Sequence, residues 1–141
     1  MRLLPGMKAE TQALQARTHS FFVSVIKLCE SVPDTPAARS ICEQLLDSSG
    51  STDSNYRAAC KARSKKEFIA KIGVAAEEAD ESLGWLTALR DAQLVNRDAA
   101  APLIREANEL TSIFVASSKT ATENLAEEER RRAAKRRLRP R

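Results

Sequence analysis

The chain has 141 residues, of which 43% are hydrophobic, 30% are charged and only 4% are aromatic. This length predicts one domain, and the richness in strong helix formers predicts an all-α fold. The apolar stretch 21–26 is too short to span a bilayer and the first residues lack the core of a signal peptide, which argues against a membrane or secreted protein.

The net charge of +4 is unevenly distributed along the chain. Residues 125–141 contain eight Lys or Arg and three Glu, which makes +5, so residues 1–124 are close to neutral at −1. We therefore predict a four-helix bundle domain over residues 1–124 and a basic C-terminal extension over residues 125–141. Any acidic partner is expected to meet the extension or a local basic cluster.

The first predicted helix carries apolar or small residues at alternating steps of four and three. They are Leu14, Thr18, Phe21, Val25, Leu28 and Val32, which is the pattern of a bundle helix. Pro33 ends this helix. Thr35 is the expected N-cap of the next helix, because Pro36 then takes the first helical position, where a missing N–H costs nothing.

The second segment is ambiguous from its residues alone. Ile41 and Leu45 share one helical face, and small polar residues continue that spacing, but the composition of Ser48–Ser54 favours a loop. A broken helix and one continuous helix are equally compatible with this pattern. In a continuous helix, the small side chains would allow a neighbouring helix to approach closely.

The third and fourth helices have clearer signals. Ser64 and Glu67 form a capping box before a helix with apolar residues from Phe68 to Leu89. A polar connection at residues 91–98 leads to a fourth helix, which can continue through Glu127–Arg137 but has no apolar stripe there. That last part is expected to project into solvent or to fray. Four long helices with short connections predict an antiparallel up-down-up-down bundle.

No catalytic or metal-binding pattern is present. A di-metal carboxylate centre in a bundle needs two Glu-x-x-His pairs, and this chain has one histidine, His19. The acidic run Glu77, Glu78, Asp80 and Glu81 is better explained by surface charge or by pairing with Arg. Three cysteines, Cys29, Cys42 and Cys60, have no paired short spacing and indicate a reducing, cytoplasmic location. We expect a non-enzyme without a cofactor.

Several helices have apolar residues outside their main stripe. Phe22 and Ile26 lie on a second face of the first helix, and Val74 and Trp85 on a second face of the third. A wide core would explain them, but self-association through these faces is the interpretation we favour.

Two basic clusters predict contact with nucleic-acid phosphates. The first surrounds the turn between the second and third helices, with Glu67 as the opposing acid. Its members are Arg57, Lys61, Arg63, Lys65 and Lys66. The second is in the extension and comprises Arg130, Arg131, Arg132, Lys135, Arg136 and Arg137, followed by Arg139 and Arg141. Aromatic residues are not interleaved with them, so we expect sequence-tolerant binding of RNA or DNA. A solvated surface or a docking arm for a protein is the alternative.

Residues 17–89 resemble the four-helix bundle proteins encoded by intervening sequences of bacterial 23S ribosomal RNA genes, which are related to accessory proteins of diversity-generating retroelements. The matching blocks, in order, are Gln44-Leu45, Ser51, Asn55-Tyr56-Arg57-Ala58-Ala59, Ala62-Arg63-Ser64, Glu67-Phe68-Ile69-Ala70-Lys71-Ile72, Glu77-Glu78-Ala79-Asp80-Glu81-Ser82 and Trp85-Leu86.

The resemblance implies a continuous second helix, a ring-like homopentamer with a basic surface, and no enzymatic activity. The retroelement branch of the family binds a reverse transcriptase and nucleic acid, which makes both possible partners. The resemblance also implies that Arg17, Asn55, Glu78 and Glu81 are positions kept polar, and we expect some of them to form a buried hydrogen-bonded network.

Overall fold

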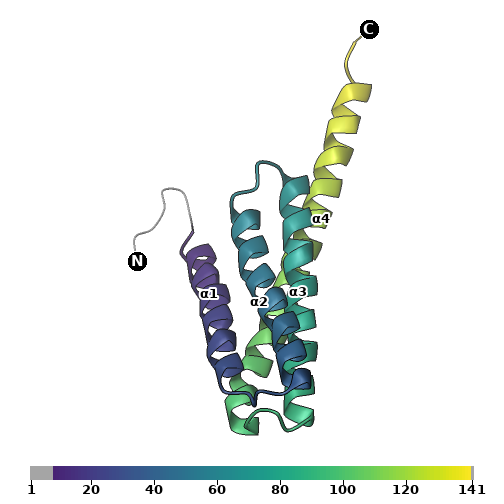
Figure 1. Ribbon diagram of the computed structural model, residues 1–141. Helices are drawn as coiled ribbons and strands as arrows, with labels where there is room; N and C mark the ends of the chain where they lie inside the picture. Colours follow the sequence, from purple (N-terminus) through teal and green to yellow (C-terminus); the bar gives the residue numbers. More distant parts are fainter. Residues whose placement is uncertain (1–7, 141) are drawn as a thin grey trace.

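The computed structural model describes residues 8–140, which form four α-helices and contain no β-strand. The helices are α1 (Ala9–Glu30), α2 (Pro36–Cys60), α3 (Lys65–Asp91) and α4 (Arg97–Arg137). They run up and down in an antiparallel bundle, as predicted (Figure 1). The predictions that involve the first seven residues and Arg141 lie outside the described part of the chain.

Side-chain caps begin three of the four helices. The Thr35 hydroxyl accepts a hydrogen bond from the backbone N–H of Ala38, and Pro36 occupies the first turn of α2, as predicted. The Ser64 hydroxyl accepts from the N–H of Glu67 at the start of α3. Asn96 caps α4 by accepting from the N–H of Asp98. The end of α3 is closed by Gln93, which has a φ of 59° and lets the N–H of Leu94 reach the carbonyl of Leu89.

Helix α2 is continuous through Ser48–Ser54, which settles the ambiguity of the sequence. Its buried hydroxyls donate to carbonyls one turn back in the same helix: Ser49 to Leu45 at 2.7 Å and Thr52 to Ser48 at 2.8 Å. The Ser48 and Ser82 hydroxyls are 2.8 Å apart and join α2 to α3. Among the described residues, no buried side-chain nitrogen or oxygen lacks a hydrogen bond. The polar residues are therefore satisfied inside a closely packed helix.

Gly50 explains how α1 fits against α2. A Cβ placed on Gly50 would lie 3.2 Å from the ring of Phe22. The missing side chain thus lets Phe22 lie directly on the α2 backbone, which offsets the low helix propensity of glycine.

The core lies along the bundle axis and contains the predicted stripes. Its largest fully buried side chains are Phe21, Val25, Leu45, Ile72, Leu86, Leu89, Leu110 and Phe114. The rings of Tyr56 and Phe114 stack with centroids 5.2 Å apart and join α2 to α4. Cys42 is buried, and burial raises the pKa of the neighbouring Cys29 thiol to about 12.

Helix α4 is far longer than the others and projects beyond the bundle (Figure 1). It runs without a break across residues 124 and 125, where we predicted the boundary of the bundle domain. The basic extension is therefore the protruding end of a bundle helix. The division of the chain into a bundle domain and a separate extension stays a prediction. No helix within residues 8–140 is long and apolar enough to cross a membrane.

Candidate nucleic-acid interface

The first basic cluster lies at the turn that joins α2 to α3. Arg57, Lys61, Arg63, Lys65 and Lys66 are all exposed there. The carboxylate of Glu67, the nearby acid, accepts a hydrogen bond from the backbone N–H of Arg63 at 3.0 Å and so serves as part of the helix cap. The capping box predicted from sequence is thus present, with the Glu67 contact one residue before the N-cap.

Most of these cations are available for a ligand. Among residues 8–140, Lys65 is the member of the cluster that forms an ion pair, with Glu128 of α4. Arg57, Lys61, Arg63 and Lys66 have no acidic partner within 4 Å in the described chain. Anions from outside the molecule can therefore approach four cations around one turn.

The second cluster surrounds the protruding end of α4. Arg130, Arg131, Arg132, Lys135, Arg136 and Arg137 are exposed. Successive residues of an α-helix are rotated by about 100°, so three consecutive arginines cannot share one face. Of these six, Arg131 is paired with Glu127 one turn earlier, at 2.7 Å. The protruding end of α4 is therefore cationic around most of its circumference.

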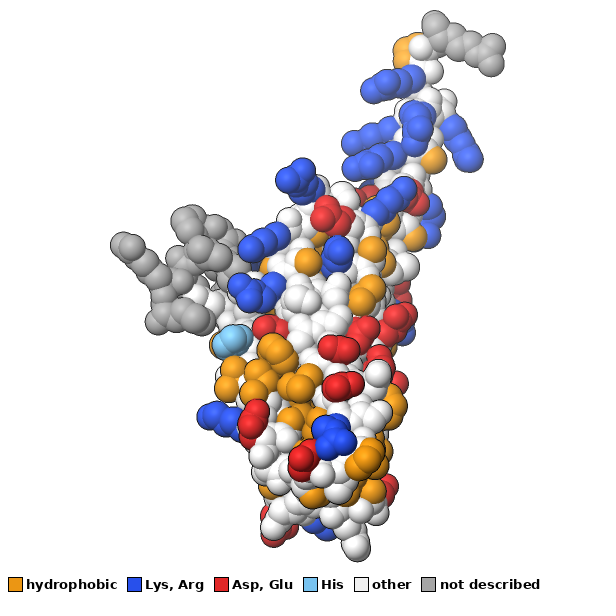
Figure 2. Space-filling view, in the orientation of Figure 1, with side chains coloured by type: hydrophobic (Ala, Val, Ile, Leu, Met, Phe, Trp, Pro, Cys, Tyr) orange, Lys and Arg blue, Asp and Glu red, His pale blue; other side chains and the backbone are white. Residues whose placement is uncertain are grey.

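The fold brings the two clusters to the same end of the bundle, although more than 60 residues separate them in sequence. The Lys65–Glu128 ion pair ties the start of α3 to α4 where α4 leaves the bundle. Interaction with Lys65 lowers the pKa of Glu128. Figure 2 shows Lys and Arg side chains around the turn and along the protruding helix, with acidic side chains concentrated over the middle of the bundle. Together the two clusters make this end of the bundle cationic, and we call it the cationic end.

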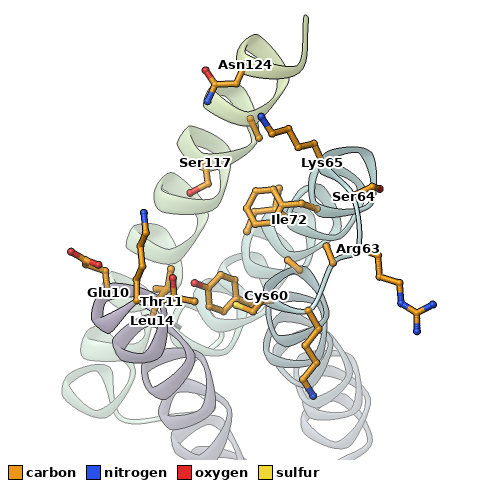
Figure 3. Close-up of a pocket in the computed structure, with 17 residues that line it drawn as sticks. Glu10, Thr11, Leu14, Cys60, Arg63, Ser64, Lys65, Ile72, Ser117 and Asn124 are labelled. Carbon is orange, nitrogen blue, oxygen red and sulfur yellow. The ribbon is translucent and has the colours of Figure 1, made fainter. Parts of the chain in front are cut away.

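A notch of about 960 Å³ opens beside the turn cluster, between the start of α1, the end of α2, the start of α3 and α4 (Figure 3). Its apolar wall is formed by Leu14, Tyr56, Phe68 and Ile72, and its rim includes Lys61, Arg63 and Lys65. Thr11, Ser117 and Asn124 add polar groups. Burial raises the pKa of Tyr56, whose hydroxyl interacts with Thr11 and the Cys60 thiol. This notch was not predicted, because Phe68 has the spacing of a core residue and nothing in the sequence places Tyr56 beside the basic turn.

The four predicted interface residues occupy two surfaces. Phe22 is half-buried on Gly50, whereas Ile26 on α1 and Val74 on α3 are each 38% exposed. Trp85 is half-buried, and its Nε1 donates to Glu81 at 3.3 Å. An apolar patch over α1 and α2 is visible in Figure 2. In the single chain these side chains are incompletely covered.

Within the described chain, neither Arg17 nor Asn55 bonds to Glu78 or Glu81, the other members of the expected polar network. Arg17 instead donates to Glu106 at 3.2 Å and lies 3.3 Å from Glu109, which joins α1 to α4. The Glu106 contact is the main reason that the pKa of Arg17 is raised. The Asn55 amide donates to the carbonyl and hydroxyl of Ser51 in its own helix. Glu81 is exposed, and the expectation that some of the four form a buried network stays a prediction.

A different buried polar contact was missed. Asp53 is 5% exposed on α2 and accepts a hydrogen bond from the Thr18 hydroxyl of α1 at 2.8 Å. His19 Nδ1 is 3.4 Å from the second Asp53 oxygen, and its side chain is largely exposed. His19 is thus not a core residue. The signal that could have found this contact was Thr18 in an otherwise apolar stripe, which needs a polar partner when buried.

Glu78 is the half-buried carboxylate of the acidic run Glu77, Glu78, Asp80 and Glu81. Burial, followed by the proximity of Glu81, raises its pKa. A raised folded pKa means that the native state binds the proton more tightly than the unfolded chain. The contribution of Glu78 to the free energy of unfolding therefore falls as the pH rises from the pKa of Glu78 in the unfolded chain through its pKa in the folded protein.

Glu78→Gln is expected to stabilise the protein at pH 7, because it removes this unfavourable charge. The gain over wild type should shrink as the pH is lowered and vanish below both pKa values. Urea unfolding at several pH values measures the difference, with Glu77→Gln as the exposed control in the same turn. A pH-independent difference, or equal gains in both variants, would show that burial of Glu78 is not the cause.

Within residues 8–140, no three His, Cys, Asp or Glu side chains are grouped so that they could hold a metal ion. The arrangement offers cations and a notch, and its chemistry is that of anion binding.

Comparison with known proteins identifies the fold and the family. A crystal structure of a protein of unknown function from the S23 ribosomal protein family of Bacteroides thetaiotaomicron is 23% identical. The similarity covers 77% of this chain and 97% of that protein, with a TM-score of 0.71. No curated protein sequence matches significantly. The model of the 23S rRNA-intervening sequence protein family matches residues 10–116, a span that includes the first basic cluster and ends before the second. The chain therefore belongs to the 23S rRNA-intervening sequence protein family.

Proposed function

We propose that this protein is a non-catalytic scaffold that binds structured RNA or DNA through its cationic end. The observation that carries the proposal is the convergence of the turn cluster (Arg57, Lys61, Arg63 and Lys66) with the helix cluster (residues 130–137). A cation bound to phosphate releases condensed counterions, and several such contacts can supply the whole free energy of non-specific binding. The family name, which refers to ribosomal RNA, supports a nucleic-acid partner.

Self-association is the second part of the proposal. Ile26, Val74 and Val115 are large apolar side chains that one subunit leaves 38%, 38% and 54% exposed. Burial of such side chains against another copy is favourable. We propose a homopentamer, in which each subunit presents its cationic end. Several weak phosphate sites on one particle would then bind a long nucleic acid much more tightly than one site does.

The assembly is tested by its mass in solution. Multi-angle light scattering of the full chain at micromolar concentration should give a multiple of 15.5 kDa, five for the pentamer. Replacement of Ile26 and Val74 by Asp should lower that mass, because a charge buried in an apolar contact is costly. Arg97→Gln, at an exposed position on α4, is the control. A wild-type mass equal to one chain would contradict self-association.

Nucleic-acid binding is tested with two sets of substitutions. The turn variant replaces Arg57, Lys61, Arg63 and Lys66 by Gln and leaves Lys65, which holds Glu128. The helix variant replaces Arg130, Arg132, Lys135, Arg136 and Arg137 by Gln, which retains helix propensity. Each should weaken binding of a structured RNA by at least about tenfold at low salt, since several counterions are no longer released.

The matched control replaces four exposed cations away from this end, Lys27, Arg39, Arg97 and Arg105, by Gln. It should bind almost as tightly as wild type. A loss confined to the helix variant would place the contact outside the region shared with the family, whereas a loss confined to the turn variant would place it in the bundle. Equal losses in all three variants would contradict a site at the cationic end. Salt-insensitive capture of a protein such as a reverse transcriptase, without RNA or DNA binding at low salt, would favour an interaction module instead.

A further inference from the structure

The notch exists because α1 is shorter than its neighbours at the cationic end. Helix α1 begins at Ala9, and Thr11 and Leu14 in its first turns line the notch. The other walls are the end of α2, the start of α3 and the part of α4 that includes Ser117, Ala121 and Asn124. Three helices therefore surround a corner that α1 does not fill (Figure 3).

The walls of the notch combine the groups that recognise an unpaired base. Phe68 is half-buried at the start of α3, and Tyr56, whose ring stacks on Phe114, also lines the notch. Aromatic and aliphatic side chains favour the face of a base, because every base has an apolar π-face. Hydroxyl and amide groups of Thr11, Ser117 and Asn124 offer donors and acceptors. The volume is within the range of small-ligand pockets, so one nucleotide fits.

The charges at the rim fit the rest of a nucleotide. Lys61 and Arg63 lie at the turn beside the notch, and neither has an acidic partner within the described chain. Lys8 and Glu10 line the opposite, α1 side and offset each other in charge. A phosphate is therefore favoured on the turn side, where two cations have no acidic partner, and this placement would direct the base inward.

We propose that the notch takes one unpaired nucleobase of a bound nucleic acid, while Lys61 and Arg63 hold the adjoining phosphate. The inference rests on the proposed function and adds to it a preference for unpaired over fully paired nucleic acid. A fully paired duplex keeps its bases stacked inside the helix and can use the cations alone. A loop or single strand can use the cations and the notch together, so it binds more tightly at an equal number of phosphates.

Cys60 provides a reporter inside the notch. Its thiol is half-buried and lines the cavity. Full-length protein is incubated with iodoacetamide, and the alkylation of each cysteine is followed by peptide mass mapping. A hairpin with an eight-nucleotide loop and a duplex of equal phosphate number are compared at saturating concentration. The hairpin should slow alkylation of Cys60 strongly, whereas the duplex should leave its rate unchanged.

A substitution that fills the notch gives the second readout. Ala121→Phe places a ring in the cavity, whereas Thr122→Phe places the same ring at the next, exposed position of α4. Wild type and Thr122→Phe should prefer the hairpin by about tenfold, the factor that one stacked base contributes. Ala121→Phe should lose that preference and retain its affinity for the duplex.

The outcomes separate this inference from the proposed function. Equal affinity for hairpin and duplex, with Cys60 equally reactive in both complexes, overturns the base site and leaves phosphate binding in place. Protection of Cys60 by an acidic amphipathic peptide, but by neither RNA, also overturns it. Failure of both RNAs to bind at about 50 mM salt, where phosphate contacts are strong, overturns the proposed function itself.

Discussion

Replacement of Phe114 by Ala is expected to lower the free energy of unfolding by about 3–5 kcal/mol. Phe114 is fully buried, and its ring stacks on Tyr56. The substitution removes the apolar contacts and leaves a cavity that the surrounding helices can close only in part. The ring of Tyr56 on α2 also loses its stacking partner, so the effect should be among the largest of any single change in the bundle.

Urea unfolding followed by circular dichroism measures this loss, and the next residue provides the control. Val115 is 54% exposed on the same helix, so Val115→Ala should change stability by less than about 0.5 kcal/mol in the isolated subunit. Equal effects of the two substitutions would contradict the assignment of Phe114 to the core. Measurement at several protein concentrations separates core packing from any contribution of Val115 to self-association.

Three of the four helices could be predicted from sequence because their signals were local. The steps of four and three from Leu14 to Leu28 in α1, and the cap at Ser64 before α3, depend on residues within a few turns of one another. Helix α2 could not be decided in this way. Its serines favour turns in isolation, and they are tolerated because their hydroxyls bond within the helix and because α1 and α3 pack closely on it.

The two basic clusters could also be predicted from the sequence, but their proximity in the folded protein could not. The ion pair between Lys65 and Glu128 depends on how far α4 extends past the turn, which is a property of the assembled bundle. At the cationic end of the bundle, α1 does not extend as far as the other three helices, and the notch lies in the space that this leaves. Phe68 and Tyr56 have core spacing in the sequence, and only the fold brings them beside Lys61 and Arg63.

The polar contacts show where sequence reasoning fails. Arg17 was one of four polar positions of which some were expected to form a network. Within the chain it pairs with Glu106 across α1 and α4, whereas Glu78 and Glu81 lie on α3. Spacing within a helix gives the face on which a charge lies. It does not say which helix that face meets, and so the partner of an arginine cannot be chosen among several acidic residues.

Binding of nucleic acid should weaken by about 10³-fold between 50 and 200 mM salt if at least six phosphates are contacted. The two clusters offer enough exposed cations for this number. In the proposed pentamer the effect should be larger than in a single chain, because each copy adds its own contacts. Fluorescence anisotropy with a labelled structured RNA measures the association constant at each salt concentration.

The slope of the logarithm of the association constant against the logarithm of salt concentration tests the central claim most directly. For wild type it should be steeply negative, and for the turn and helix variants it should be shallower by about 0.9 for each duplex phosphate contact removed. The control with Lys27, Arg39, Arg97 and Arg105 replaced should keep the wild-type slope. A wild-type slope near zero, or one that both cluster variants leave unchanged, would contradict phosphate binding at the cationic end.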